Sequence, residues 1–185
     1  MRIALCLALL IFPQSPSSST RLPDLEPMLK KDEALQHLLI VYWPPAQKGW
    51  HQAFFVRGDG TVVKQATPER PMAVADIPTC TDHITLERAK ALVRLIIQRR
   101  FLELPQRQFI VMNGPVTNEE LEMHTIGISD GQAKARRSFG IGKFAGKKEV
   151  IPPEFAAIEE ELKQIRDSAF PLHGEDCHFA PAISF

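Results

Sequence analysis

The amino-acid sequence predicts a two-layer α+β sandwich, in which two main helices cover one face of an antiparallel sheet of about six strands. Three observations predict this class. Two segments repeat apolar residues at helical spacing, several short segments are rich in β-branched and aromatic residues, and two glycine-containing turns join neighbouring strand segments. Along the chain the order is strand, hairpin, helix, and this order occurs twice.

The N-terminus has the pattern of a secretory signal peptide. Arg2 is followed by an uncharged apolar run from Ile3 to Phe12, and then by Pro13 and a serine-rich stretch. The run is too short to span a bilayer, which needs roughly 20 residues. We therefore expect a signal peptide over residues 1–19 and a periplasmic or secreted protein with no membrane span after cleavage. A buried N-terminal helix is the alternative interpretation.

Composition divides the remaining chain into three parts. Residues 20–36 are polar and proline-containing, which predicts a flexible linker. Residues 37–170 contain all the strong periodic segments and are expected to form a single α+β domain. Residues 171–185 show no regular pattern and are expected to be an irregular C-terminal tail.

Strand-like segments open each half of the domain. The first half has a strand at 38–43 and a hairpin of 52–57 and 61–65, joined by Gly58-Asp59-Gly60. Residues 66–79 contain three prolines and are predicted to be a loop. The second half has a strand at 109–112 and a hairpin of 121–129 and 132–141 around Asp130-Gly131. In its second strand Lys134, Arg136 and Ser138 alternate with more apolar positions, so we expect one sheet face to meet solvent.

Two amphipathic helices follow the hairpins. The first is predicted from Thr85, a suitable N-cap residue, to about Arg100. The second begins at Pro152-Pro153 and ends by Ser168. Its apolar stripe consists of Phe155, Ile158, Leu162 and Ile165.

Charge and glycine patterns exclude some functions. The 22 basic residues balance the 22 acidic residues, whereas a nucleic-acid-binding protein usually has a basic excess, so no nucleic-acid partner is expected. The segment 140–148 resembles a phosphate-binding loop, but Ile141 stands where a glycine is needed and Lys148 where a hydroxyl residue is needed. No cofactor is therefore predicted.

Cleavage of the signal peptide would leave two cysteines, Cys80 and Cys177. In an oxidising compartment an even number permits a disulfide, which is our prediction. Free thiols are one alternative. The other is a zinc site, for which Cys80, His83, Cys177 and His178 supply ligands of the preferred types.

Three residues are candidates for binding. Trp43 and Trp50 flank a proline-containing loop, where exposed tryptophans bind sugars or protein partners, although packing in the core also explains them. His124 lies on a strand face with Ile126 and Ile128, so it is either a partly buried structural histidine or a catalytic base. Carboxylate pairs such as those in residues 159–161 are interpreted as solvated surface. Because no serine stands in a nucleophile motif, no catalytic residue is predicted.

Four features carry a resemblance to a known group of proteins. They are the hairpin at Gly58–Gly60, the helix after Ile84-Thr85, the segment Phe101-Leu102-Glu103-Leu104 and the helix at Pro152-Pro153. With them, residues 38–166 resemble small exported bacterial domains of unknown function. This resemblance implies the same exported α+β architecture, and it transfers no catalytic residue.

The sequence therefore predicts an exported, non-catalytic domain that binds an envelope or extracellular protein, or another envelope component, through its sheet face or loops. Two alternatives stay open: a hydrolase-type enzyme with an unrecognised site, and a small-ligand or metal-binding domain that uses the Cys80 and Cys177 regions. A crevice with His124 beside a carboxylate favours the enzyme. An exposed sheet edge with Trp43 or Trp50 outside favours binding.

Overall fold

The computed structural model describes residue 22 and residues 24–45, 50–68, 76–109, 121–142, 151–170, 177–183 and 185. The predicted signal peptide lies outside these residues. The helices are α1 (Glu26–Leu29), α2 (Asp32–Leu35), α3 (Leu86–Gln98) and α4 (Pro153–Ala169), with a 3₁₀ turn η1 (Phe101–Glu103). The strands are β1 (Leu39–Trp43), β2 (Trp50–Arg57), β3 (Thr61–Pro68), β4 (Asp76–His83), β5 (Arg107–Phe109), β6 (Leu121–Ser129), β7 (Lys134–Gly142) and β8 (Cys177–Pro181). Within this part of the chain no helix is long and apolar enough to cross a membrane.

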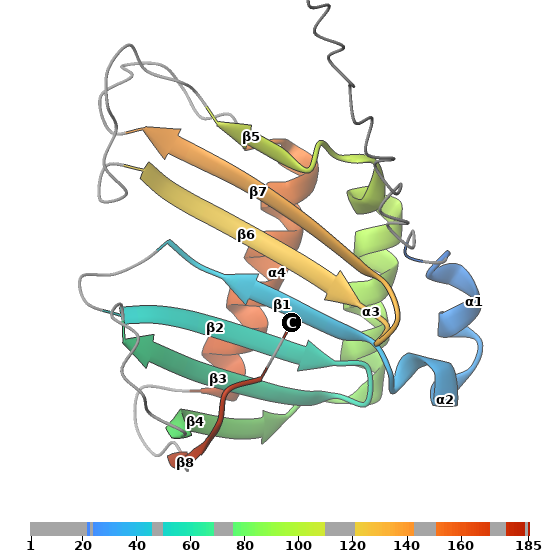
Figure 1. The fold of residues 1–185 in the computed structure, drawn as a ribbon. Helices are drawn as coiled ribbons and strands as arrows, with labels where there is room; N and C mark the ends of the chain where they lie inside the picture. The colour runs from blue at the N-terminus through green and yellow to red at the C-terminus, as the bar shows by residue number, and fades with distance from the viewer. Residues whose placement is uncertain are drawn as a thin grey trace, which may run out of the picture.

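One sheet contains all the described strands, in the order β5-β7-β6-β1-β2-β3-β4-β8 (Figure 1). Seven of them form an antiparallel sheet, and β5 joins one edge in parallel with β7. The predicted α+β class and the antiparallel sheet are confirmed. The predicted number of about six strands is too low, because β4 and β8 were not foreseen.

Prolines explain why these two strands were missed. Residues 66–79 were predicted to be a loop, but β3 extends to Pro68 and β4 begins at Asp76 with Pro78 inside it. β4 is the last strand but one, and its neighbour β8 lies in the tail that was predicted to be irregular. Proline is tolerated near a sheet edge because few ladder hydrogen bonds depend on it there.

The segment predicted as a flexible linker is also corrected. Residues 26–35 form the short helices α1 and α2, and their apolar side chains belong to the main core. The buried side chains from this stretch are Leu22, Leu25, Met28 and Leu35. Lys90 of α3 forms an ion pair of 2.9 Å with Asp32, so α2 is also tied to α3 by charge. The folded domain therefore begins before residue 37.

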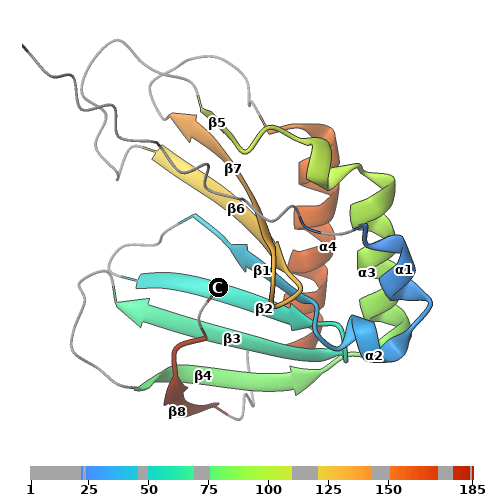
Figure 2. The same cartoon turned by 45° about the vertical axis from the view of Figure 1, so that its right-hand side comes forward.

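The main core lies between the sheet and the two long helices, which Figures 1 and 2 show on the same side of the sheet. Strand residues alternate between the two faces, so Ile40 and Tyr42 of β1 point toward the helices. α4 presents the stripe that the sequence predicted, and Phe155, Ile158, Leu162 and Ile165 are all fully buried. α3 adds Ala89, Leu92, Val93 and Ile96, and the Thr85 hydroxyl accepts a hydrogen bond from the Arg88 amide as its N-cap.

The opposite face of the sheet, here called the open face, has a smaller apolar cluster. Val41, Phe55 and Val63 are buried at its centre, on the three adjacent strands β1, β2 and β3. The cover comes from the end of the chain, because Ile183 and Phe185 pack against this cluster. Figure 1 shows the chain passing from β8 to the front of the sheet, with the long helices behind it.

Candidate binding site on the open face of the sheet

A row of open-face residues runs across five strands. Val63, Phe55, Val41, Gly127 and Arg136 are consecutive register partners on β3, β2, β1, β6 and β7. Four of them carry side chains, and the glycine leaves a gap between Val41 and Arg136. A glycine inside a strand often marks the close approach of another group.

Phe185 fills this gap. A Cβ atom placed on Gly127 would clash with Cζ of the Phe185 ring, so any larger residue at 127 would displace the ring. The rings of Phe185 and Trp43 are nearly perpendicular, with 5.1 Å between their centroids, and Nζ of Lys134 lies 5.5 Å from the Phe185 centroid. An aromatic ring is thus held between a tryptophan, a lysine and bare backbone.

The segment that leads to Phe185 is held by the polar side chain of Gln65. Gln65, which is 3% exposed, donates from Nε2 to the carbonyl of Pro181 and accepts at Oε1 from the amide of Ile183, at 3.1 and 2.9 Å. Gln65 also donates to Thr79 Oγ1 at 3.1 Å. These contacts fix the segment over β3 before it reaches β1 and β6.

Arg136 lies on the other side of the gap and reaches across it. Its guanidinium carbon lies 4.9 Å from the centroid of the Trp43 ring, which is a cation–π arrangement. Because Gly127, the register partner of Arg136, has no side chain of its own, β6 leaves room for the arginine to lean toward β1. Trp43, which was predicted as a binding residue, is therefore half-buried in an aromatic and cationic cluster.

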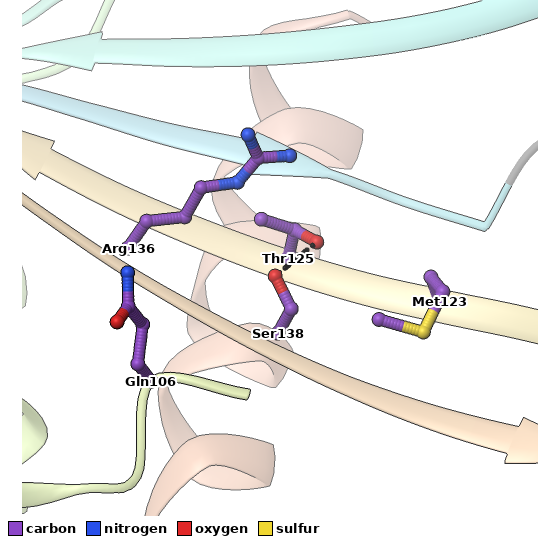
Figure 3. Close-up of a pocket in the computed structure, with 5 residues that line it drawn as sticks. All are labelled: Gln106, Met123, Thr125, Arg136 and Ser138. Atoms are coloured by element: carbon purple, nitrogen blue, oxygen red, sulfur yellow. Dashed lines mark hydrogen bonds between the residues drawn. The ribbon is translucent and has the colours of Figure 1, made fainter. Parts of the chain in front are cut away.

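A groove of about 510 Å³ continues from this cluster along β6 and β7. Gln106, Met123, Thr125, Arg136 and Ser138 line it, and Figure 3 shows these side chains above the strands with α4 behind them. Thr125 and Ser138 are register partners, with 4% and 9% of their surface exposed, and their hydroxyl oxygens are 3.0 Å apart.

The groove offers hydrogen-bond donors to a ligand. Two hydroxyl groups share one hydrogen bond, so one of their two hydrogens is left to donate elsewhere. Arg136 adds a planar fork of N–H donors suited to a carboxylate, and the Gln106 amide adds two more. On the described open-face positions of β1, β2, β3, β6 and β7, the charged residues are Arg57, Lys134 and Arg136, and no carboxylate occurs. The site therefore favours an anionic group next to an apolar one.

His124 lies on the opposite face, toward the helices. Its Nδ1 is 2.6 Å from Oε1 of Glu159 on α4. Glu159 is 4% exposed, so its interpretation as solvated surface is wrong, whereas Glu160 is exposed as interpreted. Tyr42 donates its hydroxyl hydrogen to the same oxygen at 2.6 Å, and Lys163 Nζ lies 2.9 Å from it.

The charges in this cluster are set by burial and hydrogen bonding. Burial acts to raise the pKa of Glu159, but the hydrogen bonds from His124, Tyr42 and Lys163 outweigh it and hold the pKa at about 2. Burial and the hydrogen bond to Glu159 raise the pKa of Tyr42, so the phenol stays protonated and acts as a donor. The cluster is thus an ionised carboxylate with three donors on one oxygen, which joins α4 to β1 and β6.

Cys80 and Cys177 form a disulfide, as predicted, with 2.04 Å between the sulfur atoms. They are register partners on β4 and β8, so the bond fastens the edge strand. The alternative zinc site needs both sulfurs as thiolates, which a disulfide does not supply. His83 and His178 are exposed, and no group of three or more potential metal ligands occurs among the described residues.

The structure brings together only part of the predicted site. Trp43 lies in the open-face cluster, whereas His124 lies on the other face; the side chain of Trp50 is outside the described residues. The sequence alone did not indicate Arg136, Thr125, Ser138, Gly127 or Phe185 as site residues. Arg136 and Ser138 were placed on a solvent-facing side of their strand, but their pairing with Trp43 and Thr125 depends on strand order. No protein-family model matches the chain, and no curated protein matches its sequence.

Proposed function

We propose that this protein is an exported, non-catalytic domain of the cell envelope that binds another protein through the open face of its sheet. The observation that carries this proposal is the continuous surface of Trp43, Arg136 and the donor-rich groove beside them. Aromatic and arginine side chains dominate the energetics of protein interfaces. A half-buried tryptophan under an arginine, next to an open groove, has this composition.

Export is supported by two independent features. The N-terminal pattern from Arg2 to the serines after Pro13 is typical of a signal peptide. The disulfide between Cys80 and Cys177 is typical of proteins in oxidising compartments. Mass spectrometry of the protein from its host should show an N-terminus between Ser15 and Arg21. An intact Met1 on protein from the cytoplasm would contradict export.

A second candidate function is a hydrolase-type activity, which the contact between His124 and Glu159 favours. The geometry gives this candidate less support. Glu159 is almost fully buried, and the one oxygen that His124 contacts also accepts from Tyr42 and Lys163. A carboxylate held in this way connects a helix to a sheet and offers its charge to protein donors rather than to a substrate.

The binding proposal can be tested with the mature protein as bait on an envelope extract. The wild-type protein is expected to retain a stoichiometric partner, which Trp43→Ser and Arg136→Glu should each lose. Arg94→Glu on α3 is the matched control, because it makes the same charge change on the helix side and should retain the partner. Retention by the open-face variants, or loss by Arg94→Glu alone, would contradict the proposal.

A further inference from the structure

The gap over Gly127 and the groove beside it form two adjoining subsites of different chemistry. Glycine, Trp43 and Lys134 surround a position that holds an aromatic ring. About 7 Å along β6, Thr125 occupies the next position on the same face, and Arg136 is the register partner of Gly127 on β7. Adjacent side chains of a fully extended peptide point to opposite sides, so two adjacent residues reach both positions where the peptide backbone turns between them.

We propose that the open face recognises a segment of a partner protein in which an aromatic residue is followed directly by an acidic residue. The aromatic ring enters the gap over Gly127 in place of Phe185, and the carboxylate accepts hydrogen bonds from Arg136 and from the Thr125–Ser138 hydroxyl pair. This inference rests on the proposed function and names the partner chemistry for the same surface.

The path of the chain from Pro181 to Phe185 indicates how a partner segment would cross the open face. From Pro181 on β8 the chain crosses to Gln65 on β3 and places Phe185 over β6, so it runs across the strands. A peptide that continues in the same direction reaches β7 next, where Arg136 and Ser138 lie on this face. The ring of Phe185 thus marks the aromatic position, and the groove lies where the next residue falls.

Charge complementarity selects an acidic residue for that position. Arg57, Lys134 and Arg136 are the charged residues on the described open-face positions of the five strands β1, β2, β3, β6 and β7, and the groove presents donors to its occupant. A carboxylate matches the arginine fork and accepts the remaining hydroxyl hydrogen. Because the groove continues to Gln106 beyond Arg136, a partner chain has room to continue past the acidic residue, which favours an internal segment over a chain end.

Phe185 is the competitor that any such partner must displace. It belongs to the same chain, and a group tethered by a short segment acts at a high effective concentration. Replacing Phe185 by alanine in the full-length mature chain empties the gap and leaves the disulfide and the Gln65 contacts in place. This variant should therefore bind an added peptide more tightly than the wild type does.

Three peptides with blocked N-termini serve as probes in a titration: Ala-Ile-Ser-Phe-Glu-Ala-amide, the same peptide with Gln in place of Glu, and Ala-Ile-Ser-Phe with a free carboxylate. Phe185→Ala should bind the Glu peptide at least about tenfold more tightly than the wild type does. It should bind the Glu peptide about five- to tenfold more tightly than the Gln peptide. Equal binding of the Glu and Gln peptides, or binding of the free-carboxylate peptide alone, would overturn the proposal.

Substitutions in each subsite give the matched controls. Adding Gly127→Val to Phe185→Ala fills the gap from below and should abolish binding of the Glu peptide, because a Cβ occupies the place of the ring. Adding Arg136→Glu to Phe185→Ala instead should weaken binding of the Glu peptide at least about tenfold, because the carboxylate of the peptide then meets a second carboxylate. The same change at Arg94 on α3 should leave the affinity within about twofold. Retained binding after Gly127→Val would show that the ring does not enter the gap.

A measurement on the otherwise unaltered chain covers the case in which Phe185→Ala fails to fold. With 4-fluorophenylalanine at position 185, excess Glu peptide should move the fluorine resonance toward its position in water, and the Gln peptide should do so less. An unchanged resonance at saturating peptide would overturn the proposal. The Glu peptide could fail to bind although retention of the envelope partner still depends on Trp43 and Arg136. That result would refute the proposed aromatic–acidic recognition and leave the proposed binding function intact.

Discussion

Oε1 of Glu159 is the point at which β1, β6 and α4 meet. It accepts hydrogen bonds from Tyr42 and His124 on neighbouring strands and pairs with Lys163 one turn further along the helix. Hydrogen bonds to a charged group contribute more than neutral ones, at about 1.5–3 kcal/mol each, when the alternative is an unpaired buried group. Glu159 therefore fixes the position of α4 on the sheet.

This arrangement predicts a specific dependence of stability on pH. Because the pKa of Glu159 lies below its ordinary value of 4.5, its contribution is complete above pH 4.5 and is lost as the pH falls toward 2. Glu159→Gln should lower the free energy of unfolding by about 2–3 kcal/mol at pH 7. The difference in unfolding free energy between this variant and the wild type, measured by urea denaturation, should become smaller as the pH falls from 4.5 to 2. The control is Glu160→Gln, at an exposed neighbouring position, which should change stability little at any pH. A difference in unfolding free energy between Glu159→Gln and the wild type that does not vary with pH would contradict an ionised Glu159.

Among the elements, α4 packs on the sheet through a continuous stripe of buried apolar residues. Leu162 is fully buried in the middle of its stripe, and Phe155 packs edge-on against Phe139 of β7, with the ring centroids 4.7 Å apart. Both long helices were predicted from local features, namely an apolar repeat and residues suited to their ends. These features lie within a single segment, so the sequence carries them directly.

Truncation of Leu162 to alanine should leave a cavity in the core. Similar substitutions cost about 2–5 kcal/mol. Glu160→Ala, on the exposed side of the same helix, should cost less than about 0.5 kcal/mol. The two variants can be compared by their denaturation midpoints, and equal midpoints would show that α4 does not pack on the sheet through this stripe.

β4 and β8 could not be predicted in the same way. Their segments contain Pro78 and Pro181, and β8 is largely exposed, so neither shows the alternation of a half-buried strand. Their position depends on pairing with β3 and on the disulfide, which are contacts between distant parts of the chain. The candidate site could not be predicted for the same reason. Trp43, Gly127 and Arg136 are far apart in the sequence or on different strands, and only the strand order places them together.

At the scale of the whole molecule, the disulfide closes the chain over most of its length. Cys80 and Cys177 are separated by 97 residues, and β8 leads directly into the segment that covers the open face. In the chain-entropy account, a cross-link of this span stabilises the fold by about 4–5 kcal/mol. The bond therefore also holds Phe185 near the gap that it fills.

Removal of the disulfide should show its contribution to stability. The double variant Cys80→Ala/Cys177→Ala should lose about 4–5 kcal/mol of unfolding free energy relative to the oxidised protein, less any strain that the bond imposes on the folded state. Without reductant, the intact mass of the wild type should be two hydrogens below that of the reduced form. Two thiols that react with an alkylating reagent under native, non-reducing conditions would contradict the bond.

A partner is expected to bind on the open face rather than on the helix side. Site-specific photocrosslinking in the cells that export the protein tests it most directly, with the photoreactive residue placed at Lys134 on the open face or at Gln164 on the exposed side of α4. We expect a discrete crosslinked product from position 134, none from position 164, and loss of the product when Arg136→Glu is added. The same partner captured from position 164, or no product from position 134, would contradict the account.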